Sequence, residues 1–190
     1  GAADTRMALD IVDNAKTRRY SICNAVDTVL VDATIAQRFL PALAEKWAGR
    51  VAIAGDERVR SELAQWPGRD LELREATPED WDTEHLALKA GVAVVDGLDG
   101  ALAHIERHGS SHSDAIVTEN YPAAMRFLDE VDSAAVYVNA STQFTDGAQF
   151  GLGAEVGVST QKIHARGPLG LRELTSYKWT ILGRGQVRPK

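Results

Sequence analysis

The feature that most constrains this chain is an alternation of short apolar runs with amphipathic stretches, from about residue 28 to residue 138. The apolar runs have the length of strands, and the stretches between them repeat apolar residues at the helical period of about 3.6. Buried parallel strands appear in a sequence as continuous apolar runs, and they require long crossovers between them. The pattern therefore predicts a three-layer α/β/α fold, with a mostly parallel sheet covered by helices on both faces.

The boundaries of the predicted elements follow from caps, prolines and glycines. Strands are predicted at residues 28–31, 51–54, 71–74, 87–95, 115–118 and 134–138. Helices are predicted at residues 4–15, 35–47, 57–65, 98–107 and 122–130, with a further helix start near residue 78. Glycine-rich loops should fill residues 139–170, and a last extended run at 174–182 should precede a polar tail. Such a loop-rich stretch on a regular scaffold is either a binding region or a surface connection.

Composition excludes several classes of function. The 190 residues are 44% apolar, which is enough for one sizeable core, and their formal net charge of −6 argues against nucleic acid or an anionic membrane as the main partner. No apolar run approaches the roughly 20 residues that span a bilayer. The first residues lack the basic and then apolar pattern of a signal peptide. We therefore expect a cytoplasmic protein.

The chain contains one cysteine, Cys23, which cannot form an internal disulfide. On one interpretation it is an inert residue packed beneath the strand that follows. On the other it is a nucleophile, because Lys16, Arg18 and Arg19 precede it and a turn or helix starts at it. Nearby cations and unpaired N–H groups would lower the pKa of the thiol. The backbone N–H groups of Cys23 and Asn24 would then stabilise an oxyanion beside the sulfur.

Other patterns point to no chemistry of their own. The imidazoles of His104, His108 and His112 are spaced like metal ligands on a helix, but Gly109 should end that helix before the third. No metal site is predicted. The glycines of residues 151–157 depart from the dinucleotide fingerprint by one position, and no phosphate-binding P-loop motif occurs. The chain therefore carries no complete nucleotide-binding motif.

Four segments resemble the gamma-glutamyl phosphate reductases, also called glutamate-5-semialdehyde dehydrogenases. NAKTRRYSICNAVDTVLV (residues 14–31) resembles the nucleophile segment of that family, and VDGLDGALAHIERHGSSHSDAI (95–116) fits its histidine-containing pattern. VNASTQFTDG (138–147) and GLGAEVGVSTQKIHARGPLGLRELTSYKW (151–179) are similar to further family blocks. The resemblance covers nearly the whole chain in order, and it explains the three histidines without a metal.

The resemblance implies an aldehyde dehydrogenase-like fold. Residues 1–160 would form the cysteine-bearing catalytic domain, and residues 161–190 would return to a cofactor domain and to the subunit interface of a homo-oligomer. Members of the family have an N-terminal half that builds most of the NADPH domain, and nothing in this chain corresponds to it. We therefore expect a C-terminal catalytic half that is inactive alone.

The implied activity is NADPH-dependent reduction of gamma-glutamyl phosphate to glutamate 5-semialdehyde and phosphate, in proline biosynthesis and functionally linked to glutamate 5-kinase. Cys23 would form a thioester that a hydride then reduces. Two alternatives remain open. One is a non-catalytic scaffold or assembly module of the same fold. The other is an oxidising aldehyde dehydrogenase, which would need a general base outside this chain.

The resemblance also assigns roles beyond the cysteine. Glu84 is expected to contact the nicotinamide ribose of the cofactor. The substrate-side loop is expected to contribute the side chains of Asn139, Ser141, Thr142, Phe144 and Asp146. The alternative for this loop is that Asn139 and Asp146 only hold turns.

The chain departs from the family at Tyr20, His85 and Gln143. Many members have arginine at the position of Gln143, so an anion contact there would be lost. Three further polar residues either bind a phosphate or carboxylate or hold the tail in place, and no role is assigned to them: Lys162, His164 and Arg166.

Overall fold

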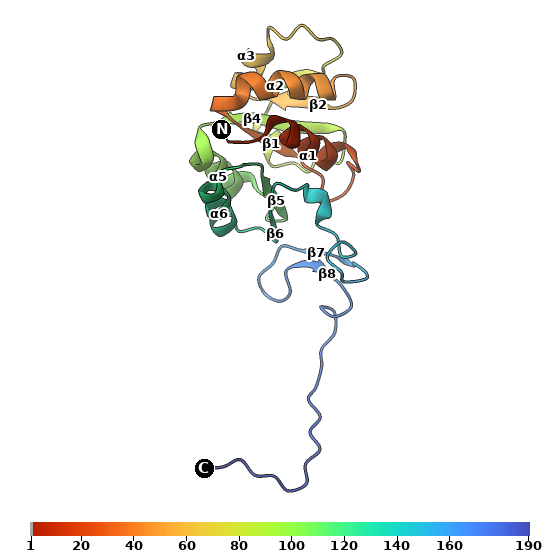
Figure 1. Ribbon diagram of the computed structural model, residues 1–190. Helices are drawn as coiled ribbons and strands as arrows, with labels where there is room; N and C mark the ends of the chain where they lie inside the picture. The colour runs from red at the N-terminus through yellow and green to blue at the C-terminus, as the bar shows by residue number, and fades with distance from the viewer. Residues whose placement is uncertain (1) are drawn as a thin grey trace.

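A four-stranded parallel sheet forms the centre of the protein, whose computed structural model describes residues 2–190 (Figure 1). Its strand order is β1-β4-β2-β3, with β1 at Thr28–Asp32, β4 at Lys89–Val95, β2 at Ala52–Gly55 and β3 at Leu73–Glu75. β4 pairs with β1 on one side and β2 on the other, and its five central residues are buried. The predicted α/β fold with a mostly parallel sheet is confirmed.

Helices cover both faces of this sheet because its crossovers run in opposite directions. α2 (Ala33–Trp47) and α3 (Glu57–Leu63) connect strands in one direction, whereas α4 (Pro78–Trp81) and α5 (Gly97–His108) belong to connections that run back. Right-handed crossovers therefore place the two pairs on opposite faces. Consistent with this, α2 packs against α3, and the Trp81 ring of α4 meets the His104 ring of α5 edge-on at 5.4 Å.

The helix at the N-terminal side, α1 (Thr5–Thr17), packs against α2. Its predicted cap is confirmed, since Asp4 accepts the backbone N–H of Met7 at 2.7 Å. The indole of Trp47, which is fully buried at the end of α2, donates to Asp13 on α1 at 3.2 Å. One apolar core under α2 thus combines α1, α2, α3 and the strands β1, β2 and β4.

A second, two-stranded parallel sheet lies beside the first. It consists of β5 (Ser113–Ile116) and β6 (Ala135–Val138), joined by α6 (Tyr121–Glu130). β5 begins and ends two residues before its predicted position. Ser113 and Asp114 look like loop residues in the sequence, but their side chains are hydrogen-bonded to Thr145 and Ser133. Figure 1 shows this pair below β1, next to α5 and α6.

The C-terminal region contains structure where the sequence predicted only loops. A short 3-10 helix, η1 (Thr142–Phe144), is followed by the antiparallel strands β7 (Gly157–Ser159) and β8 (Gly167–Leu169). These strands have three residues each and contain glycine or proline, so they give no periodic signal. The predicted domain boundary at residue 160 falls between them, and that division remains a prediction.

Beyond β8 the chain leaves the body as an extended tail (Figure 1). The extended run predicted at 174–182 has no strand pairing among residues 2–190, because an extended segment becomes a strand only against a partner. Its large apolar side chains, including Trp179 and Leu182, are exposed. None of the helices in residues 2–190 combines the length and the apolar character that crossing a bilayer requires.

Candidate active site

Cys23 lies in a tight turn between α1 and β1. The turn is closed by a hydrogen bond from the N–H of Ala25 to the carbonyl of Ile22 at 2.9 Å, and no helix starts there. The residue is exposed, so the interpretation of Cys23 as an inert residue packed under the strand does not describe it. The thiol is thus carried on a surface turn and is accessible to a substrate.

The charges around Cys23 differ from those predicted. The pKa of the thiol is raised above its usual value, first because the sulfur is partly desolvated and then because the carboxylates of Glu155 and Glu84 lie nearby. The N–H groups of Cys23 and Asn24 act in the opposite direction and lower the pKa. The prediction that upstream basic residues lower the pKa is therefore wrong for this chain.

Two of those basic residues, Lys16 and Arg18, are occupied elsewhere. Lys16 is fully buried and its ammonium group pairs with Asp27 at 3.4 Å. Burial lowers the pKa of Lys16, and Asp27 partly offsets this. Arg18 donates to the side-chain oxygen of Gln143 at 3.1 Å. The positive charge next to Cys23 in the sequence is thus used in holding α1 to its surroundings.

Asn24 attaches the cysteine turn to η1. Its side-chain amide donates to the carbonyls of Thr145 at 2.9 Å and Gln143 at 3.4 Å, and all three residues are buried. In return, the hydroxyl of Thr142 donates to the carbonyl of Asn24 at 2.7 Å. The sequence predicted only a backbone role for Asn24. The structure adds a side-chain role in fixing the turn that carries Cys23.

Hydrogen bonds to the end of α1 hold the side chain of Gln143, a position at which the chain departs from the predicted family. Its side-chain nitrogen donates to the carbonyls of Ala15 at 3.0 Å and Arg19 at 3.1 Å. It therefore closes the C-terminal end of α1 and binds that end to η1. The predicted loss of an anion contact gains no support from this buried position.

The other residues predicted on the substrate side divide into two groups. Thr142 lines the same cavity as Cys23. Asn139, at φ +56°, bridges the N–H and carbonyl of Thr118, while Asp146 accepts backbone N–H groups of the next turn at 2.9 and 3.2 Å.

Ser141 caps η1 by accepting the N–H of Gln143 at 3.3 Å, and the Phe144 ring is half exposed. Only Thr142 of the five predicted residues is thus bonded to the cysteine turn itself. Asn139, Ser141 and Asp146 hold the backbone of the loop in shape.

Two residues near Cys23 were missed by sequence reasoning. Glu155 accepts the N–H of Gly147 at 2.8 Å, and a Cβ on that glycine would lie 2.7 Å from the carbonyl of Ala154. Close packing at Gly147 thus positions the carboxylate. The only sequence signal for Glu155 was its place in the glycine-rich segment at residues 151–157, which had been considered for nucleotide binding.

The second missed residue is His112, which lines the cavity together with Cys23 and Glu84. It is buried, and burial lowers the pKa of its imidazole, although Glu155 and Glu84 raise it. Its Nδ1 is hydrogen-bonded to the Ser113 hydroxyl at 2.7 Å, and its Nε2 has no partner among the described residues.

Glu84 itself lies on the irregular segment after α4 and is exposed. The neighbouring His85, a departure from the family, donates its backbone N–H to Asp27 at 3.1 Å, and burial lowers the pKa of its ring. The carboxylate of Asp27 thus accepts hydrogen bonds from both the backbone of His85 and the ammonium group of Lys16 beside the site. Tyr20 is partly exposed in the segment before the cysteine turn.

The three residues without an assigned role fasten the β7–β8 hairpin. Lys162 and Arg166 both bind the carboxylate of Asp132, the latter at 2.6 Å, and His164 contacts the carbonyl of Glu173 at 3.0 Å. Of the two predicted roles, their contacts fit the holding of the C-terminal region. No group of three or more potential metal ligands converges in residues 2–190.

Comparison with known proteins supports the resemblance. The chain is 57% identical to gamma-glutamyl phosphate reductase of Dehalococcoides mccartyi over 182 residues, which is 95% of this chain and 42% of the relative. The crystal structure of gamma-glutamyl phosphate reductase from Thermotoga maritima superposes with a TM-score of 0.88 and 46% identity, over 99% of this chain and 44% of that one. The chain is homologous to gamma-glutamyl phosphate reductases.

The fold extends to more distant enzymes. An acetylating aldehyde dehydrogenase from Geobacillus thermoglucosidasius, at 18% identity, has a TM-score of 0.66 over the whole of this chain and 50% of that one. The predicted aldehyde dehydrogenase-like fold is therefore confirmed. No protein-family profile matches the chain. The chain spans less than half the length of the gamma-glutamyl phosphate reductases to which it is similar.

Proposed function

We propose that this chain is the cysteine-bearing catalytic part of a gamma-glutamyl phosphate reductase, with Cys23 as its nucleophile. The observation that carries the proposal is an accessible thiol on a fixed turn, with the N–H groups of Cys23 and Asn24 beside its sulfur. It is supported by the identity to gamma-glutamyl phosphate reductases of known sequence.

The chemistry begins with the thiolate of Cys23, which attacks the acyl carbon of gamma-glutamyl phosphate. A C–S bond forms, the C–O bond to phosphate breaks, and phosphate leaves with its electron pair. The N–H groups of Cys23 and Asn24 would stabilise the oxyanion of the tetrahedral species. After reduction of the thioester, the thiohemiacetal collapses, so that glutamate 5-semialdehyde leaves and Cys23 returns as a thiol.

NADPH would supply the hydride that reduces the thioester. Among the described residues, Glu84 is our candidate for a cofactor contact, because its exposed carboxylate borders the cavity that contains Cys23 and suits ribose hydroxyls as an acceptor. Most of the cofactor site would come from polypeptide outside these 190 residues. The chain alone is therefore expected to show no NADPH-dependent turnover.

We further propose the two-part division at residue 160 and an oligomer formed through the tail. The tail exposes Tyr177, Trp179, Ile181 and Leu182, side chains that interfaces normally cover. The substrate, an acyl phosphate, would come from a kinase that acts on glutamate. We accordingly propose that the reductase acts in proline biosynthesis, in the cytoplasm.

The test is a chimera that joins the remainder of the Dehalococcoides mccartyi reductase to this chain. It should oxidise NADPH when supplied with gamma-glutamyl phosphate, and C23S should lower kcat at least about a thousandfold because the alcohol is a far weaker nucleophile. S21A, in the same turn region, is the matched control and should retain activity. An inactive but folded chimera would favour the alternative of a non-catalytic scaffold, which the departures from the family at Tyr20, His85 and Gln143 motivate.

A further inference from the structure

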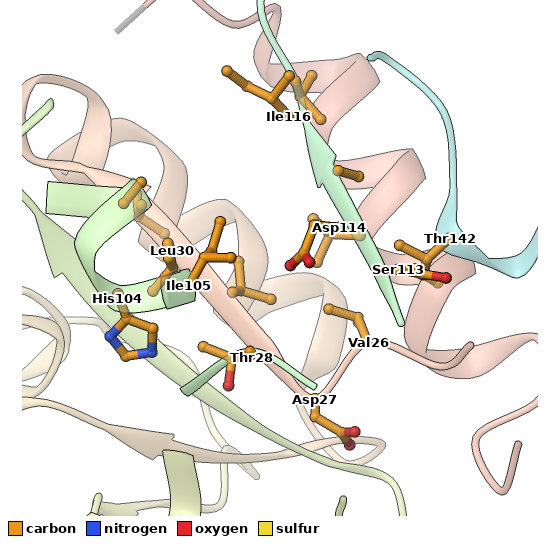
Figure 2. Close-up of a pocket in the computed structure, with 18 of the residues that line it drawn as sticks. Val26, Asp27, Thr28, Leu30, His104, Ile105, Ser113, Asp114, Ile116 and Thr142 are labelled. Atoms are coloured by element: carbon orange, nitrogen blue, oxygen red, sulfur yellow. The ribbon is translucent and has the colours of Figure 1, made fainter. Parts of the chain in front are cut away.

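Four side chains form a continuous series of hydrogen bonds that ends at the cavity lined by the cysteine. The phenol of Tyr137 on β6 bonds to the Thr145 hydroxyl at 2.8 Å, which bonds to that of Ser113 at 2.6 Å. Ser113 in turn bonds to Nδ1 of His112 at 2.7 Å. Figure 2 shows Ser113 at the beginning of β5, on the same side of the cavity as Thr142. The series therefore runs from β6 to an imidazole at the site.

The acidity of the hydroxyls sets the direction of the protons in this series. A phenol is a stronger acid than an aliphatic alcohol, so Tyr137 donates to Thr145. Each hydroxyl has one proton to give, so Thr145 donates to Ser113 and Ser113 donates to Nδ1 of the imidazole. With Nδ1 accepting, the single proton of a neutral imidazole lies on Nε2.

The surroundings of His112 favour that neutral form. The residue is 8% exposed, and burial lowers the pKa of its ring, although nearby carboxylates raise it. Nε2 has no hydrogen-bond partner within residues 2–190, and the residue lines the cavity. A buried N–H group without a partner is costly, so this one indicates an acceptor oxygen supplied by a ligand.

The residue that supports His112 also supports the cysteine turn. Thr145 is buried, and while its hydroxyl belongs to the series, its carbonyl accepts the side-chain amide of Asn24 at 2.9 Å. The carboxylate of Glu155 acts on the ionisation of both Cys23 and His112, and both residues line the cavity. The thiol and the imidazole thus face the same region, in which the oxygen of an acyl group on the sulfur would lie.

We propose that His112 donates a hydrogen bond from Nε2 to the oxygen of the acyl group on Cys23. Ser113, Thr145 and Tyr137 are positioning residues, because they fix the tautomer and the orientation of the imidazole. The inference rests on the proposed nucleophile, and it adds a side-chain donor to the two backbone N–H groups of the cysteine turn. The acyl oxygen gains negative charge as its carbon becomes tetrahedral, so the donor acts mainly on the transition state. A nitrogen that already carries a proton does not act as a base towards the thiol.

Acylation of Cys23 by p-nitrophenyl acetate tests the proposal in this chain without a cofactor. The thiolate forms a C–S bond to the acetyl carbon, the C–O bond breaks, and p-nitrophenolate leaves with its electron pair and is measured by absorbance. Alkylation by iodoacetamide is the reference reaction, because it displaces iodide without forming an oxyanion. H112L should slow acylation at least about tenfold and change alkylation less than about twofold. H112Q, whose amide keeps an N–H donor, should acylate within about threefold of the unmodified chain.

Two variants of Thr145 test the positioning series. T145V removes the hydroxyl but keeps the carbonyl that holds Asn24, so acylation should slow about threefold or more while alkylation is unchanged. T145S keeps the hydroxyl and should restore the rate of the unmodified chain. Nitrogen NMR of histidine-labelled protein, assigned by the signal lost in H112L, should show a protonated Nε2 and an unprotonated Nδ1.

Several results would overturn the proposal. Equal slowing of acylation and alkylation in H112L would mean that His112 acts on the thiol itself. Unchanged acylation in H112L, an H112Q as slow as H112L, or an Nε2 without a proton would each exclude the donor role. C23S distinguishes these failures from failure of the reductase proposal: acylation that persists in C23S would contradict Cys23 as the nucleophile.

Discussion

The four-stranded sheet and the β5–β6 pair are both parallel and both flanked by helices, but this chain buries them to different degrees. Five residues of β4 and six of α2 are buried, whereas β5 and α5 have none that is fully buried. The first region has a large buried apolar core. In the second, β5 and α5 stay half buried beside the cavity that Cys23 lines. A closely packed region and a less buried one thus lie side by side in the same fold.

The largest expected effect is a loss of stability in the region of the four-stranded sheet and α2. L43A removes a fully buried side chain from α2 and should lower the free energy of unfolding by about 2–5 kcal/mol, because it leaves a cavity in a close-packed core. I116A, on half-buried β5, should lower it by less than about 1.5 kcal/mol. Urea denaturation of both variants measures the difference. Equal losses would contradict the contrast between the regions.

A smaller effect concerns Asp80, which is buried at the edge of the four-stranded sheet. It binds Lys89 at 2.8 Å, Arg74 and the N–H of Thr77, and the Arg74 hydrogen bond is the main reason that its pKa lies far below the usual range. Because Arg74 and Lys89 are partly exposed, D80N should destabilise by about 1–2 kcal/mol.

The sign of the pH dependence follows from that lowered pKa. The contribution of Asp80 is complete above the pKa of an unfolded aspartate, about 4, and is lost as the pH falls towards the folded pKa. Stability measured between pH 6 and pH 2 should therefore fall less steeply in D80N. D129N, on the exposed surface of α6, should keep the slope of the unmodified chain.

A third prediction tests the connection between the two regions. Gln143 joins the end of α1 to η1, which follows β6. Q143A would leave the buried carbonyl of Ala15 and the partly buried carbonyl of Arg19 without this donor and should cost about 1–2 kcal/mol. Exchange of the amides near Cys23 should also accelerate. If only global stability changed, Gln143 would have no particular role at the cysteine turn.

The smallest effect is electrostatic. E155Q removes a negative charge near Cys23 but keeps an oxygen that can accept the N–H of Gly147, so the pKa of the thiol should fall. At pH 8 the thiolate fraction then increases, and alkylation by iodoacetamide should accelerate several-fold. E119Q, which changes an exposed carboxylate that is not among the groups shifting the Cys23 pKa, is the control. An unchanged rate in E155Q would show that Glu155 does not influence the thiol.

Sequence patterns predicted best where burial is complete. Strands β1, β2 and β4 of the larger sheet are mostly apolar, whereas Ser113 and Asp114 of β5 are polar, which shifted that strand by two residues. A turn or helix start at Cys23 was predictable from local residues, but the exposure of Cys23 and the pKa of its thiol were not. That pKa depends on Glu155, which is 132 positions away in the sequence, and on the pairing of Lys16 with Asp27. Contacts of this kind depend on the folded arrangement and leave no local pattern.

The shared use of Asp132 by Lys162 and Arg166 has a consequence for the tail. Lys162 and Asp132 are exposed and Arg166 is partly buried, so dissolved ions weaken their attraction. The ion pairs of Asp132 with Lys162 and Arg166 should therefore hold the β7–β8 hairpin more firmly in dilute buffer than in concentrated salt. The direction in which the hairpin presents the aromatic tail should therefore depend on the ionic strength of the solution.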